Sequence, residues 1–336
     1  MVIRHEAYDL SQRNTFGMKV SCRLYVEVTE PEDLLTLDFD ALPQPLFVMG
    51  GGSNLLFTRD FPGTVLHLSN KGYTVAGPLV TVGAGVVFDD FCAWAAQEGL
   101  WGPENLSLIP GEVGASAVQN IGAYGVEAKD IIDTVHAFDR TTRSFVDIPC
   151  ADCAYGYRTS RFKTDWKGRY IITSVTFRLS TAPQPKLDYG GVRKALGERE
   201  PSPQVIRETV IGIREQKLPD PKEIGSAGSF FCNPVIEREH FERIVALARE
   251  ENGPEYEVPH YDVGDRVKVP AAWMIDQCGF KGMRLGGAQV YPKQPLVIVN
   301  ATGSATPDEI VALEQRVIDT IRAKYDIELH PEVEHV

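Results

Sequence analysis

The sequence predicts an α+β fold divided into two or three lobes, and two observations support this. Strand-sized apolar runs, such as residues 296–299, alternate with amphipathic helix patterns along the chain. The chain is 336 residues long. Single hydrophobic cores stop growing below this size, so we expect separate lobes. The apolar fraction of 43% and the charged fraction of 24% are those of an ordinary globular protein.

The first 68 residues read as short strands with one helix. Residues 22–28 form an apolar strand, and Pro31 followed by two acidic residues marks a helix start. Residues 45–49 form a buried strand that runs into Gly50-Gly-Gly-Ser-Asn54. We therefore expect a first lobe at residues 1–68.

Residues 69–215 read as a second lobe. A helix is expected at residues 88–97, because Phe88, Cys92 and Ala95 share one helical face. Residues 181–203 are rich in proline, glycine and charge, which predicts an inserted loop. Strands are expected at residues 79–82, 131–138, 144–148 and 170–179.

A third domain is expected at residues 216–325. The helix predicted at residues 204–215 ends before Pro219 and Pro221, which cannot continue a helix, so we place the boundary there. Residues 326–336 are expected to return near the first lobe, with a short strand at 328–334. The other expected elements are strands at 230–236 and 296–300 and helices at 237–250, 271–278 and 307–324.

The charge and cysteine content exclude several classes of protein. Lys and Arg number 34 against 46 Asp and Glu, which gives a net charge of −12. A chain this acidic is a poor candidate for coating nucleic acid or an anionic membrane. No apolar run is long enough to span a bilayer, and the N-terminus shows no signal peptide. Six cysteines in 336 residues are no disulfide scaffold, so we expect a cytoplasmic protein.

Two glycine-rich segments are candidates for binding an anion. In residues 50–54, successive glycines let backbone N–H groups converge on a pyrophosphate, although a tight turn uses the same residues. The Rossmann fingerprint fails here, because Leu55 stands where its third glycine belongs. Residues 109–125 carry glycines among small side chains, which favours a backbone-lined cofactor site over a mobile loop.

Two further motifs are candidates for binding or catalysis. Arg158, Arg161 and Lys163 lie among aromatic residues, a pattern that a solvated basic patch also shows. Ser229 follows flexible glycines at the start of an apolar strand, where its hydroxyl could serve chemistry or cap the strand. A serine hydrolase is disfavoured, because Phe231 replaces the last glycine of the nucleophile-elbow pattern.

No metal site is expected. Cys150 and Cys153 are interpreted as structural, because no second cysteine pair completes a zinc site. In the C-terminal strand, alternation puts His330, Glu332 and Glu334 on one face. A carboxylate there is informative only if the tail is anchored in a pocket.

Taken in order, these motifs resemble one family closely, the UDP-N-acetylenolpyruvoylglucosamine reductases, which are flavoproteins of peptidoglycan precursor synthesis. The resemblance extends from about residue 14 to the end of the chain. The segments that carry it are Asn14-Thr-Phe-Gly17, residues 50–56, residues 109–127, Tyr157-Arg-Thr-Ser-Arg-Phe-Lys163, Lys217-Leu-Pro-Asp-Pro221, Gly228-Ser-Phe-Phe-Cys-Asn-Pro234, residues 271–282 and Pro331-Glu-Val333.

The resemblance implies a two-lobed FAD-binding domain of the vanillyl-alcohol-oxidase type, followed by a C-terminal α+β substrate domain. Asp188-Tyr189-Gly190 resembles the tyrosine loop of the subtype that carries this insertion. Ala115 stands where some members carry a hydroxyl, which affects one FAD contact but not the site. The residues implied to bind FAD non-covalently are Gly50, Gly51, Gly52, Ser53, Asn54, Ile109, Pro110, Gly114, Ala115, Gly122 and Arg214.

The implied reaction is reduction of the enolpyruvyl ether of a UDP-sugar to the lactyl ether, which gives UDP-N-acetylmuramate. NADPH would reduce FAD first, and hydride would then pass to the vinyl group, so ping-pong kinetics are expected. Arg158 would face the carboxylate and Ser229 would protonate the adjacent carbon. Glu332 would act as a protonated donor, or hold a water or cation. The residues implied to bind substrate are Tyr124, Arg158, Tyr189, Lys217, Asn233 and Lys268.

Two alternatives remain open, a flavin oxidase of the same fold and a non-catalytic nucleotide-sugar-binding protein. We expect a monomer. Because every implied ligand is anionic, the acidic surplus should lie away from the site. Six cations are then expected to share one cleft: Arg158, Arg161, Lys163, Arg214, Lys217 and Lys268.

Overall fold

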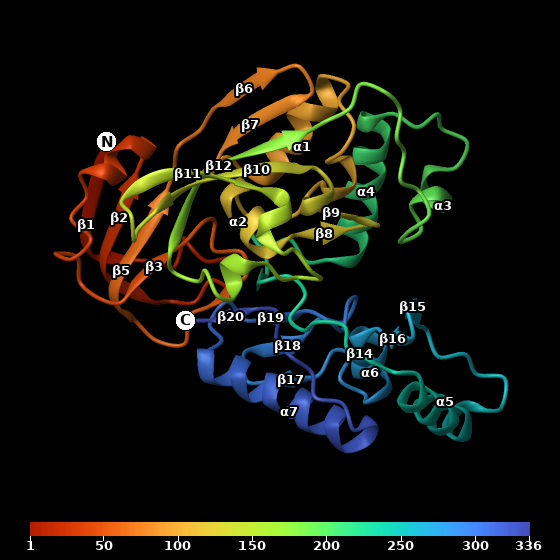
Figure 1. Cartoon of the computed structure of the whole chain (residues 1–336). Coiled ribbons are helices and arrows are strands. Elements are labelled where there is room, and N and C mark those ends of the chain that lie inside the picture. The colour runs from red at the N-terminus through yellow and green to blue at the C-terminus, as the bar shows by residue number, and fades with distance from the viewer. The chain divides into compact units, whose positions relative to one another are not determined.

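The computed structural model describes residues 1–336 and divides them into two compact units. Unit 1 contains residues 1–14, 19–53 and 60–216. Unit 2 contains residues 15–18, 54–59 and 217–336. Two short N-terminal segments therefore belong to the unit formed mainly by the C-terminal part of the chain. Figure 1 labels most of the helices and strands of both units.

The first sheet of unit 1 has the order β1-β2-β5-β3. β1 (Val2–Asp9) and β2 (Ser21–Val28) are antiparallel, whereas β5 (Phe61–Leu68) runs parallel to β2 and to β3 (Leu46–Val48). Gly63 allows β3 and β5 to pair closely, because a Cβ there would lie 1.9 Å from the Pro45 carbonyl oxygen. The 3-10 helix Pro31–Leu35 buries Leu34 in the core beneath this sheet.

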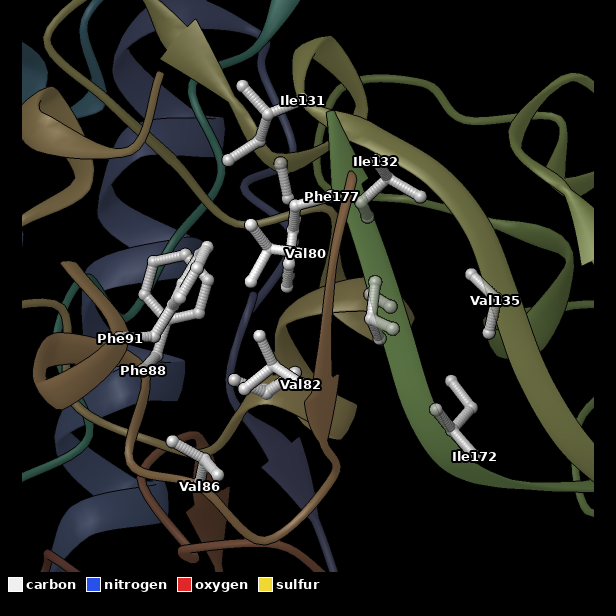
Figure 2. Close-up of a cluster of buried hydrophobic side chains, with 14 of the residues drawn as sticks. Val80, Val82, Val86, Phe88, Phe91, Ile131, Ile132, Val135, Ile172 and Phe177 are labelled. Carbon is white, nitrogen blue, oxygen red and sulfur yellow. The ribbon is translucent and has the colours of Figure 1, made fainter. Parts of the chain in front are cut away.

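The second sheet of unit 1 is antiparallel throughout. Its order is β11 (Ser144–Pro149), β10 (Ile132–Asp139), β12 (Tyr170–Arg178), β7 (Leu79–Gly83) and β6 (Tyr73–Ala76) (Figure 1). α1 (Phe88–Gln97) packs on it, and Figure 2 shows Phe88 and Phe91 beside Val80 and Val82. The ring of Phe91 stacks on Phe177 at 4.5 Å. α2 (Val113–Gln119) buries Val113 and Ala117 in the same core.

The segment predicted as an inserted loop at residues 181–203 contains a helix, α3 (Val192–Leu196). Three apolar side chains of this segment, Leu187, Val192 and Leu196, form a core with Ile206 and Val210 of α4 (Pro203–Lys217). Composition alone predicts a loop here, but these side chains give the segment a packed face.

Short elements complete unit 1. They include two small strands and several single helical turns, which carry the motifs between the main strands. They are 3-10 helices at Glu104–Leu106, Ala128–Asp130, Cys150–Cys153 and Arg161–Lys163, and strands β8 (Gly122–Ala123) and β9 (Val126–Glu127).

Unit 2 contains two small antiparallel sheets and three helices. One sheet has the order β13 (Gly225–Ser226), β19 (Ile298–Asn300), β18 (Ala288–Val290) and β17 (Arg284–Leu285). The other has the order β14 (Val235–Glu237), β16 (Arg266–Lys268) and β15 (Tyr261–Val263). The helices are α5 (Arg238–Asn252), α6 (Ala271–Gln277) and α7 (Pro307–Tyr325).

The sequence signals for α7 are clear. Thr306 caps the helix, and its hydroxyl accepts a hydrogen bond from the backbone N–H of Glu309 in a capping box. Ile310, Leu313, Val317 and further apolar residues at helical spacing form its buried face. None of the helices in the chain combines the length and the apolar character needed to cross a bilayer.

Two predicted strands of unit 2 are shorter than expected. Residues 230–236 form a regular strand only at β14, and the tail forms one only at β20 (Glu334–His335). β20 pairs in parallel with β4 (Leu55–Leu56), a strand of the same unit. Outside these two strands, an isolated antiparallel bridge joins Phe231 to Pro331.

Candidate active site

The two glycine-rich segments face each other in unit 1. The Ser53 hydroxyl donates a hydrogen bond to the Pro110 carbonyl oxygen at 3.0 Å. A Cβ on Gly51 would lie 3.4 Å from the Gly111 Cα, and one on Gly111, where φ is +118°, would lie 2.8 Å from the Ser53 hydroxyl oxygen. The two segments are therefore in contact, and a side chain at Gly111 would be strained by the positive φ and would displace the Ser53 hydroxyl.

Gly52 and Gly114 also lie so close to neighbouring residues that a Cβ at either position would collide with them. Gly52 has a φ of +65°, and a Cβ there would lie 2.0 Å from the Arg13 carbonyl oxygen. A Cβ on Gly114 would lie 2.9 Å from the Ala84 side chain. The backbone hydrogen bonds of the chain include none donated by the N–H groups of residues 50–54. Such a run of available N–H groups on a glycine backbone suits a diphosphate.

Arg158, Tyr124 and Arg214 form a second group in unit 1. Arg158 has a φ of +56° and Tyr124 one of +48°, conformations that non-glycine residues rarely adopt and that occur often at functional sites. An Arg158 guanidinium N–H donates to the Gly122 carbonyl oxygen at 2.8 Å. Burial raises the pKa of Tyr124, and the nearby positive charge of Arg214 opposes that shift.

Arg214 has a buried guanidinium in this group. Burial lowers the pKa of Arg214 and the positive charge of Arg158 acts in the same direction, whereas Tyr124 and Asp89 oppose the shift. Its Nε atom is buried without a hydrogen-bond partner in the chain. Two close arginines with an unsatisfied donor favour an anionic ligand.

The Tyr189 segment packs against Tyr124. A Cβ on Gly190 would lie 2.6 Å from the Tyr124 ring, and one on Gly125 would lie 3.1 Å from the Tyr189 Cβ. Asn105 is fully buried and connects the two segments. Its side-chain amide donates to the carbonyl oxygens of Tyr124 and Lys186 at 2.9 and 2.8 Å. Sequence reasoning missed Asn105, since no local pattern marks an asparagine whose partners lie 19 and 81 residues away.

The tail of unit 2 brings Glu332 close to Ser229. The Glu332 N–H donates to the Phe230 carbonyl oxygen at 2.8 Å, and the Cys232 N–H donates to the His330 carbonyl oxygen at 3.0 Å. Ser229 immediately precedes Phe230, so this antiparallel pairing fixes the two predicted catalytic residues one residue apart in register. Both are half-buried.

Asn54, which was predicted to bind FAD, contacts the same tail. Its side-chain amide donates to the Glu332 carbonyl oxygen at 3.0 Å, and its own carbonyl oxygen accepts from the Glu334 N–H at 3.0 Å. Asn54 belongs to unit 2, whereas Gly50–Ser53 belong to unit 1. Its amide therefore holds the backbone that carries Glu332.

The remaining predicted substrate residues of unit 2 occupy separate elements. The Asn233 side-chain oxygen accepts from the Ala271 N–H at the start of α6 at 2.9 Å. Lys268 lies on β16 with its ammonium group 5.4 Å from the centre of the Tyr261 ring. Lys217 ends α4 and is exposed.

Among the six cations expected to share one cleft, Arg161 is paired with a neighbouring carboxylate. The Arg161 guanidinium pairs with Asp165 at 2.5 Å and lies 4.0 Å from the centre of the Trp166 ring. Lys163 stays with Arg158, because its ammonium donates to the Arg158 carbonyl oxygen at 3.2 Å. Two cations of the same motif thus differ: Arg161 is paired with a carboxylate, and Lys163 binds the backbone of Arg158.

Asp89 is a further residue that sequence reasoning missed. Its carboxylate accepts two hydrogen bonds from Arg207 of α4, at 2.5 and 2.9 Å, and one from the Leu108 N–H at 2.5 Å. One side chain of α1 therefore fixes both the helix that carries Arg214 and the residue that precedes Ile109.

Comparison with known proteins identifies the family. A family model for the C-terminal domain of UDP-N-acetylenolpyruvoylglucosamine reductase matches residues 220–336, and an FAD binding domain model matches residues 23–143. The chain is 46% identical to the UDP-N-acetylenolpyruvoylglucosamine reductase of Bacteroides fragilis, covering 98% of this chain and 99% of that protein. It is 44% identical to that of Porphyromonas gingivalis over the full length of both chains.

A solved structure supports the fold. The UDP-N-acetylenolpyruvylglucosamine reductase (MurB) of Thermus caldophilus superposes with a TM-score of 0.70 at 24% identity, covering 100% of this chain and 98% of that one. The predicted fold class, an FAD-binding domain followed by a C-terminal domain of mixed helix and sheet, is confirmed. The chain therefore belongs to the UDP-N-acetylenolpyruvoylglucosamine reductase family, and it is an FAD-dependent oxidoreductase.

Proposed function

We propose that this chain uses NADPH to reduce the enolpyruvyl group of a UDP-sugar to a lactyl ether, with Arg158, Ser229 and Glu332 as the residues that act on the substrate. The observation that carries the assignment is the backbone pairing of Phe230 with Glu332. It holds the backbone positions of Ser229 and Glu332 one residue apart in register, and these residues carry a hydroxyl and a carboxyl, two groups able to handle a proton.

The residues of unit 1 fit FAD. The facing segments 50–53 and 109–114 offer a glycine backbone with available N–H groups, and these would hold the diphosphate. Gly122, Ala115 and Arg214 complete the proposed cofactor contacts. When bound, FAD supplies the hydride. The chain must then orient the alkene and stabilise the charge that develops on it.

Arg158 is proposed to bind the carboxylate of the enolpyruvyl group. Addition of hydride to the terminal carbon places negative charge on the adjacent carbon and its carboxylate. A guanidinium can stabilise that charge with two parallel N–H bonds, which strengthen as the charge grows. The bond from Arg158 to the Gly122 carbonyl oxygen, at 2.8 Å, fixes the guanidinium in advance of the reaction.

Ser229 is proposed to protonate the carbon next to the carboxylate. A serine hydroxyl is a weak acid, so it needs a basic carbanion and a group that returns the proton. Glu332 can return it only in its protonated form, since a carboxylate there would repel the developing negative charge. The two residues proposed to act on the enolpyruvyl group therefore need different charges: Arg158 must be positively charged, and Glu332 must be neutral.

The other predicted residues are proposed to recognise the nucleotide. Tyr124, Tyr189, Lys217, Asn233 and Lys268 would contact the diphosphate and the rest of the UDP-sugar. NADPH is proposed to use the same pocket in turn, because the chain shows no second nucleotide fold. We further propose a cytoplasmic monomer, in keeping with six cysteines that form no disulfide.

Initial rates with purified protein test this function. At several fixed NADPH concentrations and varied UDP-sugar, double-reciprocal plots should be parallel, and the product should be heavier than the substrate by two hydrogen atoms. Intersecting lines without substrate inhibition would reject the shared pocket. Oxidation of the organic substrate with consumption of dioxygen, and without oxidation of NADPH, would indicate an oxidase. Absence of a yellow cofactor would indicate a binding protein.

A further inference from the structure

A chain of three polar side chains is buried in unit 1 beneath the glycine segments. The Tyr25 hydroxyl lies 3.0 Å from the His67 Nδ1 atom, and the His67 Nε2 atom lies 3.0 Å from both carboxylate oxygens of Glu112. Tyr25 is on β2 and His67 on β5, while Glu112 immediately precedes α2. Tyr25 and His67 are 1% and 5% exposed. The proposed mechanism uses none of them.

The direction of each hydrogen bond in this network follows from the groups that take part in it. Burial raises the pKa of Tyr25 above its ordinary value, so the phenol keeps its proton. Its O–H can then donate to Nδ1 of His67, which leaves the Nε2–H to donate to Glu112. This is a charge-assisted hydrogen bond between a buried ring and a largely buried carboxylate, and such bonds are strong.

Glu112 connects both glycine segments. It follows Gly111 in the second segment, and its side chain lies against the first: a Cβ on Gly50 would be 3.2 Å from its Oε2 atom, and one on Gly51 would be 3.7 Å from its Cγ atom. The His67 bond therefore determines where this side chain rests. A carboxylate that turned from His67 toward the glycine N–H groups would compete with an anionic ligand for them.

The Tyr25 end of this hydrogen-bonded network also leads toward the first glycine segment. The Tyr8 ring stacks on Tyr25 at 4.4 Å, and the Arg13 guanidinium lies 5.3 Å from the centre of the Tyr25 ring. The carbonyl oxygen of Arg13 is the atom that would meet a Cβ on Gly52. The network thus reaches residues 50–52 directly through Glu112 and, at its other end, indirectly through Arg13.

We propose that His67 is a positioning residue for the cofactor site: by holding Glu112 against Gly50 and Gly51, it keeps the two glycine segments at the separation that FAD binding needs and keeps the Glu112 charge away from the diphosphate. The proposal rests on the assignment of these segments to FAD. It gives a role to a histidine that lies 45 residues from its carboxylate partner.

Two substitutions of His67 provide the test, because each replaces only one of the two hydrogen bonds that the ring nitrogens make. Glutamine places its amide nitrogen near the position of Nε2, so His67→Gln keeps the donor to Glu112. Asparagine reaches only the position of Nδ1, so His67→Asn keeps a partner for Tyr25 and loses Glu112. Both variants remove the ring and one buried hydrogen bond, so we expect similar losses of thermal stability.

The measurement is the dissociation constant of FAD for the full-length chain, obtained from flavin fluorescence after removal and re-addition of FAD. We expect His67→Gln to bind FAD within about threefold of the wild type, and His67→Asn to bind about tenfold more weakly. Tyr25→Phe, which leaves the Glu112 bond in place, should also stay within about threefold.

Equal weakening in both His67 variants, or weakening that follows the melting temperature in all three variants, would overturn the proposal. If His67→Asn does not fold, the more accessible pair Glu112→Gln and Glu112→Ala replaces it, with weak FAD binding expected only for alanine. Failure of the wild-type chain itself to bind FAD would instead reject the proposed function.

Discussion

The Glu332 backbone N–H donates a hydrogen bond of 2.8 Å to the carbonyl oxygen of Phe230. Through this bond, a tail residue and the residue after Ser229 are held in register although they lie about a hundred positions apart. The Asn54 amide holds the carbonyl group of the same Glu332. Three segments that are distant in sequence therefore determine where the proposed proton-handling groups lie.

Ser229→Ala should separate the two half-reactions. Reduction of the flavin by NADPH should proceed at the wild-type rate, while reduction of the enolpyruvyl group should slow by at least about 100-fold, since a positioned acid contributes this much. Rapid-mixing absorption measures both steps. Ser226→Ala, a buried serine on the same segment, is the control and should leave both rates near wild type. Equal loss of the two steps in Ser229→Ala would reject the proton-donor role.

Asn54→Ala distinguishes a cofactor contact from a role in holding the tail. Loss of the hydrogen bond to the Glu332 carbonyl should slow enolpyruvyl reduction by roughly three- to tenfold and leave FAD affinity unchanged. Flavin fluorescence and rapid mixing report the two quantities separately. A large fall in FAD affinity with normal substrate reduction would assign Asn54 to the cofactor instead.

Substitutions of Glu332 test its protonation state. Glu332→Gln keeps the length of the side chain and a neutral donor, whereas Glu332→Asp keeps the ionisable group but withdraws it by one methylene. A residue that works as a neutral donor should lose less activity in glutamine than in aspartate, as measured by the rate of enolpyruvyl reduction. The opposite order would show that the negative charge is needed.

Gly52→Ala should damage the proposed cofactor site through a backbone collision. The new Cβ would lie 2.0 Å from the Arg13 carbonyl oxygen, at a φ of +65°. Gly77→Ala is a matched control with a φ of +62° and no atom within 4 Å. Both should lose about 1–2 kcal/mol of unfolding free energy from the positive φ, but only Gly52→Ala should also lose FAD affinity. Similar FAD affinity in both variants would argue against a role of this segment in binding.

Several features of the fold and of the proposed site are visible in the sequence. The glycine segments, the cap and apolar face of α7, and the prolines that end α4 are local signals, because the residues that fix the conformation are neighbours in the chain. The motifs of the family also place Arg158, Ser229 and Glu332 by order alone. Local propensity and motif order therefore account for most of the fold and for the outline of the proposed site.

Other parts depend on long-range partners and could not be predicted. The helix α3 forms because Leu187, Val192 and Leu196 find apolar partners on α4, although the composition of residues 181–203 is that of a loop. The bonds of Asn105 and of His67 have no local pattern, because their partners are brought near only by the fold.

Asp89 should make stability depend on pH. Burial favours its protonated form, but hydrogen bonds from Arg207 and the Leu108 N–H, together with the positive charges, outweigh burial and lower the pKa of Asp89. In the unfolded chain the pKa is about 3.9, so the stabilisation is full above about pH 5 and is lost as the pH falls through the lower folded value.

Denaturant unfolding of Asp89→Asn checks this. The variant should be less stable than the wild type at pH 7, and the gap should narrow as the pH falls toward about 3. Asp90→Asn, at the exposed neighbouring position on α1, should show a small difference at every pH. A gap for Asp89→Asn that does not change with pH would show that the carboxylate charge is not what stabilises the fold.

The most direct test of the central claim, that this chain reduces an enolpyruvyl group through bound FAD, is the anaerobic absorption spectrum of the purified protein. We predict a flavin band that is lost on addition of NADPH and that returns when one equivalent of the enolpyruvyl UDP-sugar is added. A band that stays unchanged with NADPH, or that is lost and does not return with the UDP-sugar, would contradict the account.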